Sequence, residues 1–502
     1  MSEKVKVFYE KLPKLIDDVI APMGRFQYAI AFMLGFNAII VSKETVVTTF
    51  YSYQPNFSCK NLKENQCSPN GTCTDGYVFD DKDHTVVSEW SLICNREYLV
   101  PMISTLYFTG MAIGSFVCGL ISDRFGRKPT LLLCLYAQGV IGLSLSIVYD
   151  INWFIALRFV QGFFVQGLLT VIYVLLMEYC SPTKRTIVGM SFEIMWATGL
   201  IYLGGMAYAV RDWRDLQLFL AIPTIVAVIS SWFIPESMHW LCTNDRKADA
   251  FKVCVQTAKY NGNYKSIEVE HRYWLENIEK EPVGCNSNSI ETNTYSAKEI
   301  LRDIFTTGCL KKHIFIMAST WFIVSMCYYG ILLLIPSMPG DRHINFIVGG
   351  LFEMFSSSST YFALAKFGRT KTTMVCLCVN GILLVAIGVC SSYDAAAVIQ
   401  ITTAVLSRGI ASALIYANFV QGNELFPTVT RGCASGICGL MGKLGTVLAP
   451  FILPLAKHVS PILPMAILGI LSILSGLAQY FLPETLNIQT PNSVADAQKI
   501  WE

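Results

Sequence analysis

Charge is scarce in this chain of 502 residues. Asp, Glu, Lys and Arg make up 15% of it, hydrophobic residues make up 53%, and the mean hydropathy is +0.46. A soluble chain this apolar could not cover its surface with polar groups. The hydrophobic residues also come in long uncharged blocks, such as 99–122 and 129–149, which is the pattern of membrane-spanning helices. The composition therefore argues against a soluble protein and predicts a multi-pass membrane protein.

Sequence motifs for enzymatic chemistry are missing as well. The chain has no phosphate-binding glycine loop with its lysine, no H-E-x-x-H and no nucleophile elbow, and its six histidines are scattered. A formal net charge of +2 gives no basic footprint for nucleic acid. The first 25 residues contain no long apolar run, so we expect no cleaved signal peptide. We expect no metal, no cofactor, no nucleic-acid partner and no enzyme activity.

Twelve apolar segments are long enough to cross a lipid bilayer. They lie near 27–47, 99–122, 129–149, 153–179, 187–209, 215–234, 313–337, 344–366, 371–391, 395–419, 430–456 and 459–482. The predicted fold is therefore an all-α membrane protein with twelve transmembrane helices. A long polar segment in the middle divides these helices into two six-helix bundles, 27–234 and 313–482.

Loop charges predict which ends of the helices face the cytoplasm. Residues 51–98 contain four Lys and Arg against seven Asp and Glu, whereas residues 235–312 contain eleven Lys and Arg. Because basic loops stay inside, the first segment is predicted to be extracellular and the second cytoplasmic. Residues 1–26 and 483–502 are then cytoplasmic, so both termini face the same side. The first helix is expected to direct the chain to the membrane.

The extracellular segment holds a group of four cysteines, Cys59, Cys67, Cys73 and Cys94. They lack a paired C-x-x-C, and in an oxidising compartment disulfides are favoured over a zinc site. Their pairing is left open among three connectivities. Asn56 and Asn70 begin N-glycosylation sequons in the same segment.

A charged, glycine-containing turn joins the second and third predicted helices. It reads Gly119-Leu-Ile-Ser-Asp123-Arg124-Phe125-Gly126-Arg127-Lys128-Pro129, and a glycine at position 126 permits a tight turn. Residues 365–371 after the eighth helix echo it, with Ala365 in place of Asp123. The run resembles the loop between helices 2 and 3 of the major facilitator superfamily, which implies two related halves and an inner gate.

Charged residues at the cytoplasmic ends of the helices are predicted to form that gate by pairing with one another. Arg408, which lies in the tenth helix, is interpreted in the same way. The predicted gate residues are Gly119, Asp123, Arg124, Gly126, Arg127, Arg158, Glu178, Arg185, Glu236, Arg369, Glu424 and Arg431.

Several further stretches resemble a narrower group within that superfamily, the organic cation, anion and carnitine transporters. Pro235-Glu-Ser-Met-His-Trp-Leu241 is similar to their P-E-S-P-R-W-L signature, with Met238 and His239 as departures. Trp90-Ser-Leu-Ile-Cys94 is similar to their W-x-L-V-C motif. The resemblance extends from Gly24 to Glu484. It implies transport of small organic ions across the plasma membrane.

Ionisable residues inside predicted spans are costly and so mark candidate sites. Glu193, Glu353 and Lys443 lie deep in their spans and are predicted either to pair between helices or to line a pocket with two acids and one base. Lys43 and Glu44 near the end of the first span are interpreted as an interfacial pair, with charges of the pocket as the alternative. Aromatic residues at similar depth either pack or form a cage for an organic ammonium. Those assigned to the pocket are Trp196, Trp321, Tyr328 and Tyr416.

The resemblance leaves the sign of the substrate charge open. Lys443 occupies a position that is aspartate in the cation carriers, whereas Glu353 matches an acid of helix 8. Such a mixed pocket suits an organic cation or a zwitterion such as carnitine, with the zwitterion's carboxylate facing Lys443. An organic anion transporter is the alternative, and a non-transporting receptor or scaffold with the same fold is the second alternative. The oligomeric state cannot be read from the sequence.

Overall fold

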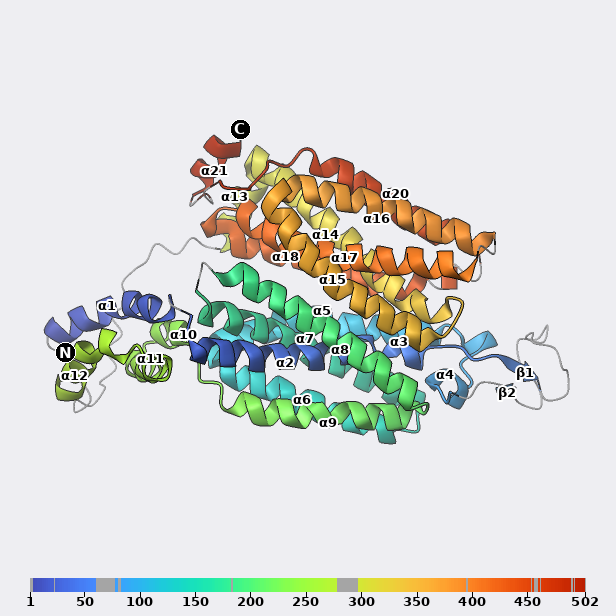
Figure 1. Cartoon of the computed structure of the whole chain (residues 1–502), viewed down its shortest axis with the longest axis horizontal. Coiled ribbons are helices and arrows are strands. Elements are labelled where there is room, and N and C mark those ends of the chain that lie inside the picture. The colour runs from blue at the N-terminus through green and yellow to red at the C-terminus, as the bar shows by residue number, and fades with distance from the viewer. Residues whose placement is uncertain are drawn as a thin grey trace.

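The computed structural model describes residues 3–21, 23–59, 77–79, 83–181, 184–277, 297–393, 396–452, 454–455, 459–460, 462–488, 491 and 493–501. Long helices dominate it and form two bundles, which lie one above the other in Figure 1. The N-terminal half contains α2 (Arg25–Val46), α3 (Thr48–Tyr51), α5 (Leu99–Phe125), α6 (Arg127–Ile147), α7 (Ile151–Tyr179), α8 (Arg185–Ala209) and α9 (Trp213–Trp232). The C-terminal half contains α14 (Gly308–Leu334), α15 (Arg342–Phe367), α16 (Arg369–Ser392), α17 (Ala397–Leu425), α18 (Thr428–Leu448) and α20 (Ile462–Gln479).

The shorter elements gather at the two ends of the bundles. Both chain termini lie at one end, which we call the terminal end, and β1 and β2 lie at the opposite end, which we call the hairpin end (Figure 1). The hairpin end carries β1 (Phe57–Cys59), β2 (Tyr77–Phe79) and α4 (Val86–Glu89). The terminal end carries α1 (Glu3–Ile20), α10 (Met238–Thr243), α11 (Lys247–Asn261), α12 (Glu268–Asn277), α13 (Ala297–Thr306) and α21 (Val494–Trp501). β1 and β2 pair antiparallel.

Eleven of the described helical segments are long and apolar enough to cross a membrane. The predicted eighth span corresponds to α15, which is not among them. This helix has 26 residues but contains Glu353 and four consecutive serines, 356–359, which make it less apolar. It packs against α8 and α17 inside the assembly, so Glu353 and Ser357 are covered by protein. The predicted fold of two six-helix bundles is confirmed.

Local sequence signals explain where these helices begin and end. Asp150, Asp212 and Asp341 cap α7, α9 and α15, because each carboxylate accepts a hydrogen bond from a backbone N–H of the first turn. Gly126 (φ 112°) separates α5 from α6, and Gly368 (φ 96°) separates α15 from α16. Both glycines adopt a backbone conformation that side chains disfavour. The two short turns therefore fall at matching places in the two halves.

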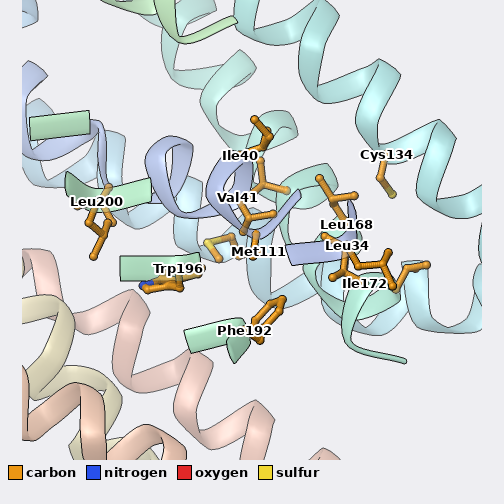
Figure 2. Packing of buried hydrophobic residues seen from close by; sticks show 14 of the residues in the cluster. Leu34, Ile40, Val41, Met111, Cys134, Leu168, Ile172, Phe192, Trp196 and Leu200 are labelled. Atoms are coloured by element: carbon orange, nitrogen blue, oxygen red, sulfur yellow. The ribbon is translucent and has the colours of Figure 1, made fainter. Parts of the chain in front are cut away.

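Each half has its own packing, and the halves meet along four helices. In the N-terminal half α5 packs on α7 and α2 on α8, while in the C-terminal half α16 packs on α20 and α14 on α18. The main contacts between the halves join α8 to α15 and α5 to α18. Figure 2 shows apolar side chains inside the N-terminal half, with Phe192 and Trp196 of α8 at the side of this cluster nearer the C-terminal half.

The contact between α5 and α7 depends on glycine. A Cβ atom at Gly110 would overlap the carbonyl group of Phe159 on the facing helix. We therefore expect Gly110→Ala to lower stability by about 1–3 kcal/mol, the usual cost of overpacking. Thermal unfolding of the purified protein measures this. Gly205→Ala is the control, since a Cβ there meets nothing within 4 Å, and equal melting temperatures for the two variants would contradict the expectation.

Candidate functional site

Aromatic side chains from both halves meet along the interface between the bundles. Trp196 donates a hydrogen bond from its indole N–H to the hydroxyl of Tyr328, with 3.1 Å between the two heavy atoms. The ring of Phe108 lies 5.1 Å from Tyr329, and that of Tyr173 lies 5.7 Å from Phe419. α5, α7 and α8 of one half and α14 and α17 of the other therefore supply one aromatic surface.

Two further predicted aromatic residues extend this surface. Trp321 is half-buried, and its ring packs edge-on against Phe419 at 4.6 Å. Tyr416 is buried on the same helix as Phe419, close to the backbone of α8 at Gly189. Sequence reasoning missed Phe108 and Phe419, because nothing in a run of apolar residues shows which side of a helix faces the other half.

Lys443 joins the two halves through a neutral partner. Its ammonium donates a hydrogen bond to the side-chain oxygen of Gln166, 2.8 Å away on α7. The lysine is half-buried, and no carboxylate lies within ion-pair distance of it in the part of the chain that the structure describes. The predicted partners Glu353 and Glu193 are thus not in contact with it. An amide leaves the lysine's positive charge uncompensated, which is costly inside a membrane.

Glu353 is held in a satisfied interhelical pair. Its carboxylate accepts hydrogen bonds from Arg408 (3.1 Å), Tyr328 (2.8 Å) and Ser412 (3.0 Å). Glu353 is 1% exposed and Arg408 is fully buried. This is the paired alternative that the sequence left open for Glu353. It also corrects the interpretation of Arg408 as a gate residue, because its partner is the deep acid of α15.

Glu193 differs from Glu353 in its surroundings. It is half-buried on α8, and none of the described residues makes a hydrogen bond or an ion pair with its carboxylate. It lies one helical turn from Trp196 on the same face of α8, and Trp196 is part of the aromatic surface. Glu193 and Lys443 therefore share one feature. Both are partly exposed charged residues along this interface, and neither forms an ion pair with a described residue.

A second buried polar cluster lies inside the N-terminal half. Lys43 and Glu44 pair at 2.7 Å, and Gln161 donates to Glu44 at 3.0 Å. Arg158 donates to Gln161 at 2.6 Å and also to the hydroxyl of Thr48. All these side chains except that of Thr48 are at most 1% exposed.

These positions correct two predictions. Lys43 and Glu44 are not an interfacial pair, because both are buried. Arg158 does not belong to the gate, because it lies near the hairpin end of α7, whereas the other gate residues lie toward the terminal end. Position along the chain suggested depth correctly for Arg158 but did not reveal its partners, Gln161 on α7 and Thr48 on α3.

The predicted gate residues of the N-terminal half form a network at the terminal end. Arg127 pairs with Asp123 at 2.9 Å and with Glu178 at 3.3 Å. Glu236 accepts hydrogen bonds from the backbone N–H groups of Arg127 (3.0 Å) and Lys128 (3.2 Å). The start of α6 is thereby tied to α5, α7 and the segment after α9.

The C-terminal half repeats this network. Arg369 pairs with Glu424 at 2.9 Å, and its backbone N–H donates to Glu484 at 2.7 Å. Sequence reasoning missed Glu484, although a signal was present, since Phe-Ile-Pro-Glu236 and Phe-Leu-Pro-Glu484 follow corresponding helices. Ala365 takes the place of Asp123, so this half has one carboxylate fewer.

The remaining predicted gate residues do not form ion pairs among the residues that the structure describes. Arg124 and Arg185 are exposed, and Arg431 donates to the backbone carbonyl of Phe426 at 3.4 Å. Gly119 has no side chain to form an ion pair, and a Cβ atom at this position would meet nothing within 4 Å. Every described ion pair among the predicted gate residues therefore stays within one half.

At the hairpin end, by contrast, an ion pair joins the two halves. Asp83 of the N-terminal half pairs with Arg342 at the start of α15, and also with Arg211 at 3.3 Å. His343 stacks on Phe50 with 5.4 Å between ring centres. Charged and aromatic contacts thus cross between the halves at the hairpin end.

The predicted extracellular modifications are only partly covered by the structure. Cys59 and Cys94 are each disulfide-bonded. Asn56 is exposed just before β1. Cys67, Cys73 and Asn70 lie outside the described residues. Glycosylation and the disulfide pairing stay predictions.

Comparisons with known proteins agree on one family. Residues 95–450 match the Major Facilitator Superfamily. The chain is 28% identical over 516 residues to human "Organic anion transporter 3", covering 96% of this chain and 92% of that protein. It is 27% identical over 527 residues to the Drosophila melanogaster "Organic cation transporter protein", covering 96% and 94% of the two chains.

Solved structures share the fold. The inward open conformation of the xylose transporter XylE from E. coli matches with a TM-score of 0.66 and 15% identity, covering 95% of this chain and all of that one. XylE bound to 6-bromo-6-deoxy-D-glucose matches with a TM-score of 0.65 and 16% identity, covering 95% of this chain and 99% of that one.

Proposed function

Because the chain belongs to the major facilitator superfamily, we propose that it carries small organic ions with a carboxylate group across the plasma membrane by alternating access. The observation that carries this proposal is Lys443, a membrane-embedded ammonium whose only described partner is the amide of Gln166. A substrate carboxylate would supply the missing negative charge. The aromatic surface beside it suits the apolar body of such a substrate.

The second unmatched charge widens the range of substrates to zwitterions. Glu193 has no described hydrogen-bonding partner, and Trp196 lies one turn away on the same helix. An ammonium group can be held by a carboxylate together with aromatic faces. A zwitterion would therefore place its carboxylate at Lys443 and its ammonium toward Glu193. Glu353 takes no part in this scheme because Arg408 already neutralises it.

The contacts at the two ends support alternating access. The halves are joined at the hairpin end by Asp83 and Arg342, whereas the described gate pairs at the terminal end stay within each half. With the acidic loop outside and the basic loop inside, as the charge rule predicts, this is an inward-facing arrangement. The outward-facing state would reverse it by closing the terminal end.

Closure of the terminal end gives Asp123 a role. Asp123 lies in the last turn of α5 and Arg431 lies in the first turn of α18, and these two helices meet across the halves. The Asp123 side chain is 70% exposed in this structure, so it is free to reach a second cation. We propose that Asp123 pairs with Arg431 when the terminal end closes.

We expect Asp123→Asn to slow turnover by one to two decades, since a lost coupling of about 1–3 kcal/mol shifts the populations of the two states by that much. Folding should be unaffected, because an exposed ion pair contributes only about 0–1 kcal/mol. Initial uptake rates per molecule at the cell surface measure the effect. Asp249→Asn is the control, since it breaks an exposed pair with Arg246 at the same end. Equal rates for the two variants would rule out the gate role.

An uptake screen in proteoliposomes tests the proposed function. One aromatic carboxylate, one zwitterion and one quaternary ammonium compound are offered, with membrane potential and pH varied separately. The proposal requires saturable uptake of the carboxylate or the zwitterion. A carrier of simple organic cations, the second candidate, is favoured by the unmatched Glu193 and would transport only the ammonium compound. No saturable uptake of any of the three would favour a receptor or scaffold instead.

A further inference from the structure

His343 lies in the contact between the two halves at the hairpin end. It is 3% exposed and belongs to the first turn of α15, one residue before the predicted span 344–366. Its ring stacks on that of Phe50 on α3, with 5.4 Å between the ring centres and 10° between the ring planes. The ring of Tyr208 on α8 lies edge-on to it at 6.0 Å. Residues of the N-terminal half therefore enclose a titratable side chain of the C-terminal half.

Charged groups from both halves face the imidazole ring of His343. From the N-terminal half, the guanidinium of Arg211 lies 3.4 Å from Nδ1, and a carboxylate oxygen of Asp83 lies 3.8 Å from Nε2. From the C-terminal half, a carboxylate oxygen of Asp341 lies 3.4 Å from Nδ1, and Arg342 pairs with Asp83. Two guanidinium groups and two carboxylates thus surround the ring, so these charges balance while His343 is neutral.

The contact with Arg211 favours the neutral form of His343. A guanidinium has only donors, so Nδ1 accepts from Arg211 and Nε2 carries the single ring proton. A second proton on Nδ1 would face the guanidinium and could only turn toward Asp341. The Asp341 side chain is 41% exposed, and its carboxylate already accepts from two backbone N–H groups of α15. Burial, and then the Arg211 charge, hold the pKa of His343 below its usual value.

We propose that His343 makes the contact between the halves sensitive to pH, so that acidification on the hairpin side favours opening of the hairpin end. The proposal rests on the alternating access proposed above, because opening would separate His343 from Phe50, Asp83 and Arg211 and expose its ring to water. An exposed histidine titrates near pH 6.5. The open state then binds a proton more readily than the closed state, so the closed contact is stable above about pH 6.5 and is weakened as the pH falls below it.

The size of the effect follows from proton linkage. Because the ring is neutral in the closed state, the ratio of open to closed molecules rises by up to about tenfold for each pH unit below 6.5. We therefore expect this ratio to rise about tenfold between pH 7.5 and pH 5.5. His84 at the same end provides a comparison. It pairs with Asp212 at 2.8 Å, and both residues belong to the N-terminal half, so opening would leave this pair intact.

Distance measurements by pulsed EPR on the purified full-length protein in nanodiscs, without any substrate, test this proposal. Spin labels on noncanonical amino acids replace Trp153 and Val398, which are exposed in the first turns of α7 and α17 at the hairpin end of opposite halves. The ratio of long to short distances should rise about tenfold from pH 7.5 to pH 5.5. His343→Asn keeps an acceptor near the position of Nδ1 but cannot titrate, so its ratio should not change with pH. His84→Gln is the matched control and should respond like the wild type.

A second variant decides the case in which His343→Asn does not fold. Arg211→Gln keeps His343 but removes the guanidinium beside Nδ1, so its ratio should rise less on acidification than that of the wild type. The proposal is overturned if the wild-type ratio is the same at both pH values. It is also overturned if His343→Asn or Arg211→Gln responds as fully as the wild type, or if His84→Gln abolishes the response. Saturable uptake without a pH-dependent distance would contradict this inference alone, whereas a pH-dependent distance without uptake would contradict only the proposed transport.

Discussion

Replacing Lys443 by glutamine is expected to lower the uptake of organic carboxylates about 100-fold or more, because losing one partner of a buried charge pair costs about 2–5 kcal/mol. Glutamine retains a hydrogen bond to Gln166 but removes the positive charge that the proposed substrate needs. Lys443→Asp should abolish carboxylate uptake and improve the carriage of simple organic cations. Uptake of one anion, one cation and one zwitterion, normalised to protein at the cell surface, measures these effects.

The conservative variant Lys443→Arg is the control for this prediction. It keeps the charge at the same depth, so it should retain most of the carboxylate uptake. Glutamine and arginine variants that lose the uptake of all three substrates equally would show that Lys443 has a structural role. The selectivity assigned to Lys443 would then be wrong.

Breaking the ion pair between Glu353 and Arg408 is expected to cost about 3–5 kcal/mol of stability, because the remaining charge is left buried without a partner. Glu353→Gln leaves the guanidinium unpaired, and Arg408→Gln leaves the carboxylate unpaired. Either single variant should therefore accumulate poorly and unfold at a lower temperature. The double variant removes both charges and should recover part of the loss.

The melting temperatures of the two single variants and the double variant test this pair. A structural pair predicts that the losses in the single variants are not additive in the double variant. If instead Glu353→Gln leaves the melting temperature unchanged and lowers only the uptake of ammonium substrates, Glu353 belongs to the substrate pocket. Ser412→Ala is the milder control, since it removes only one neutral donor to the same carboxylate.

The helices could be predicted from the sequence because bilayer length and loop charge constrain them strongly. Predicted and observed ends differ by a few residues in most spans, for instance 129–149 against Arg127–Ile147. α15 was also placed correctly despite its serines, and the turn around Gly368 that ends it repeats the one around Gly126. The six short helices at the terminal end were not predicted individually, since polar amphipathic segments have no comparable length rule.

Contacts between charged residues could be predicted only where a motif fixed them. The Asp123, Arg127 and Glu178 network follows from the turn and its cytoplasmic neighbours. In contrast, the partner of Lys443 is a glutamine on α7, and the partner of Glu353 is an arginine on α17. One sequence shows how deep such residues lie, but it does not show how each helix is rotated about its axis.

The most direct test of the account is a binding comparison at Lys443. An aromatic carboxylate and its primary amide, which has nearly the same shape but no charge, are titrated against the purified wild-type protein and against Lys443→Gln. The account predicts that the wild type binds the carboxylate about 100-fold more tightly than the amide, and that this preference falls to within a few-fold in the variant. A preference for the carboxylate that is the same in both proteins would contradict it.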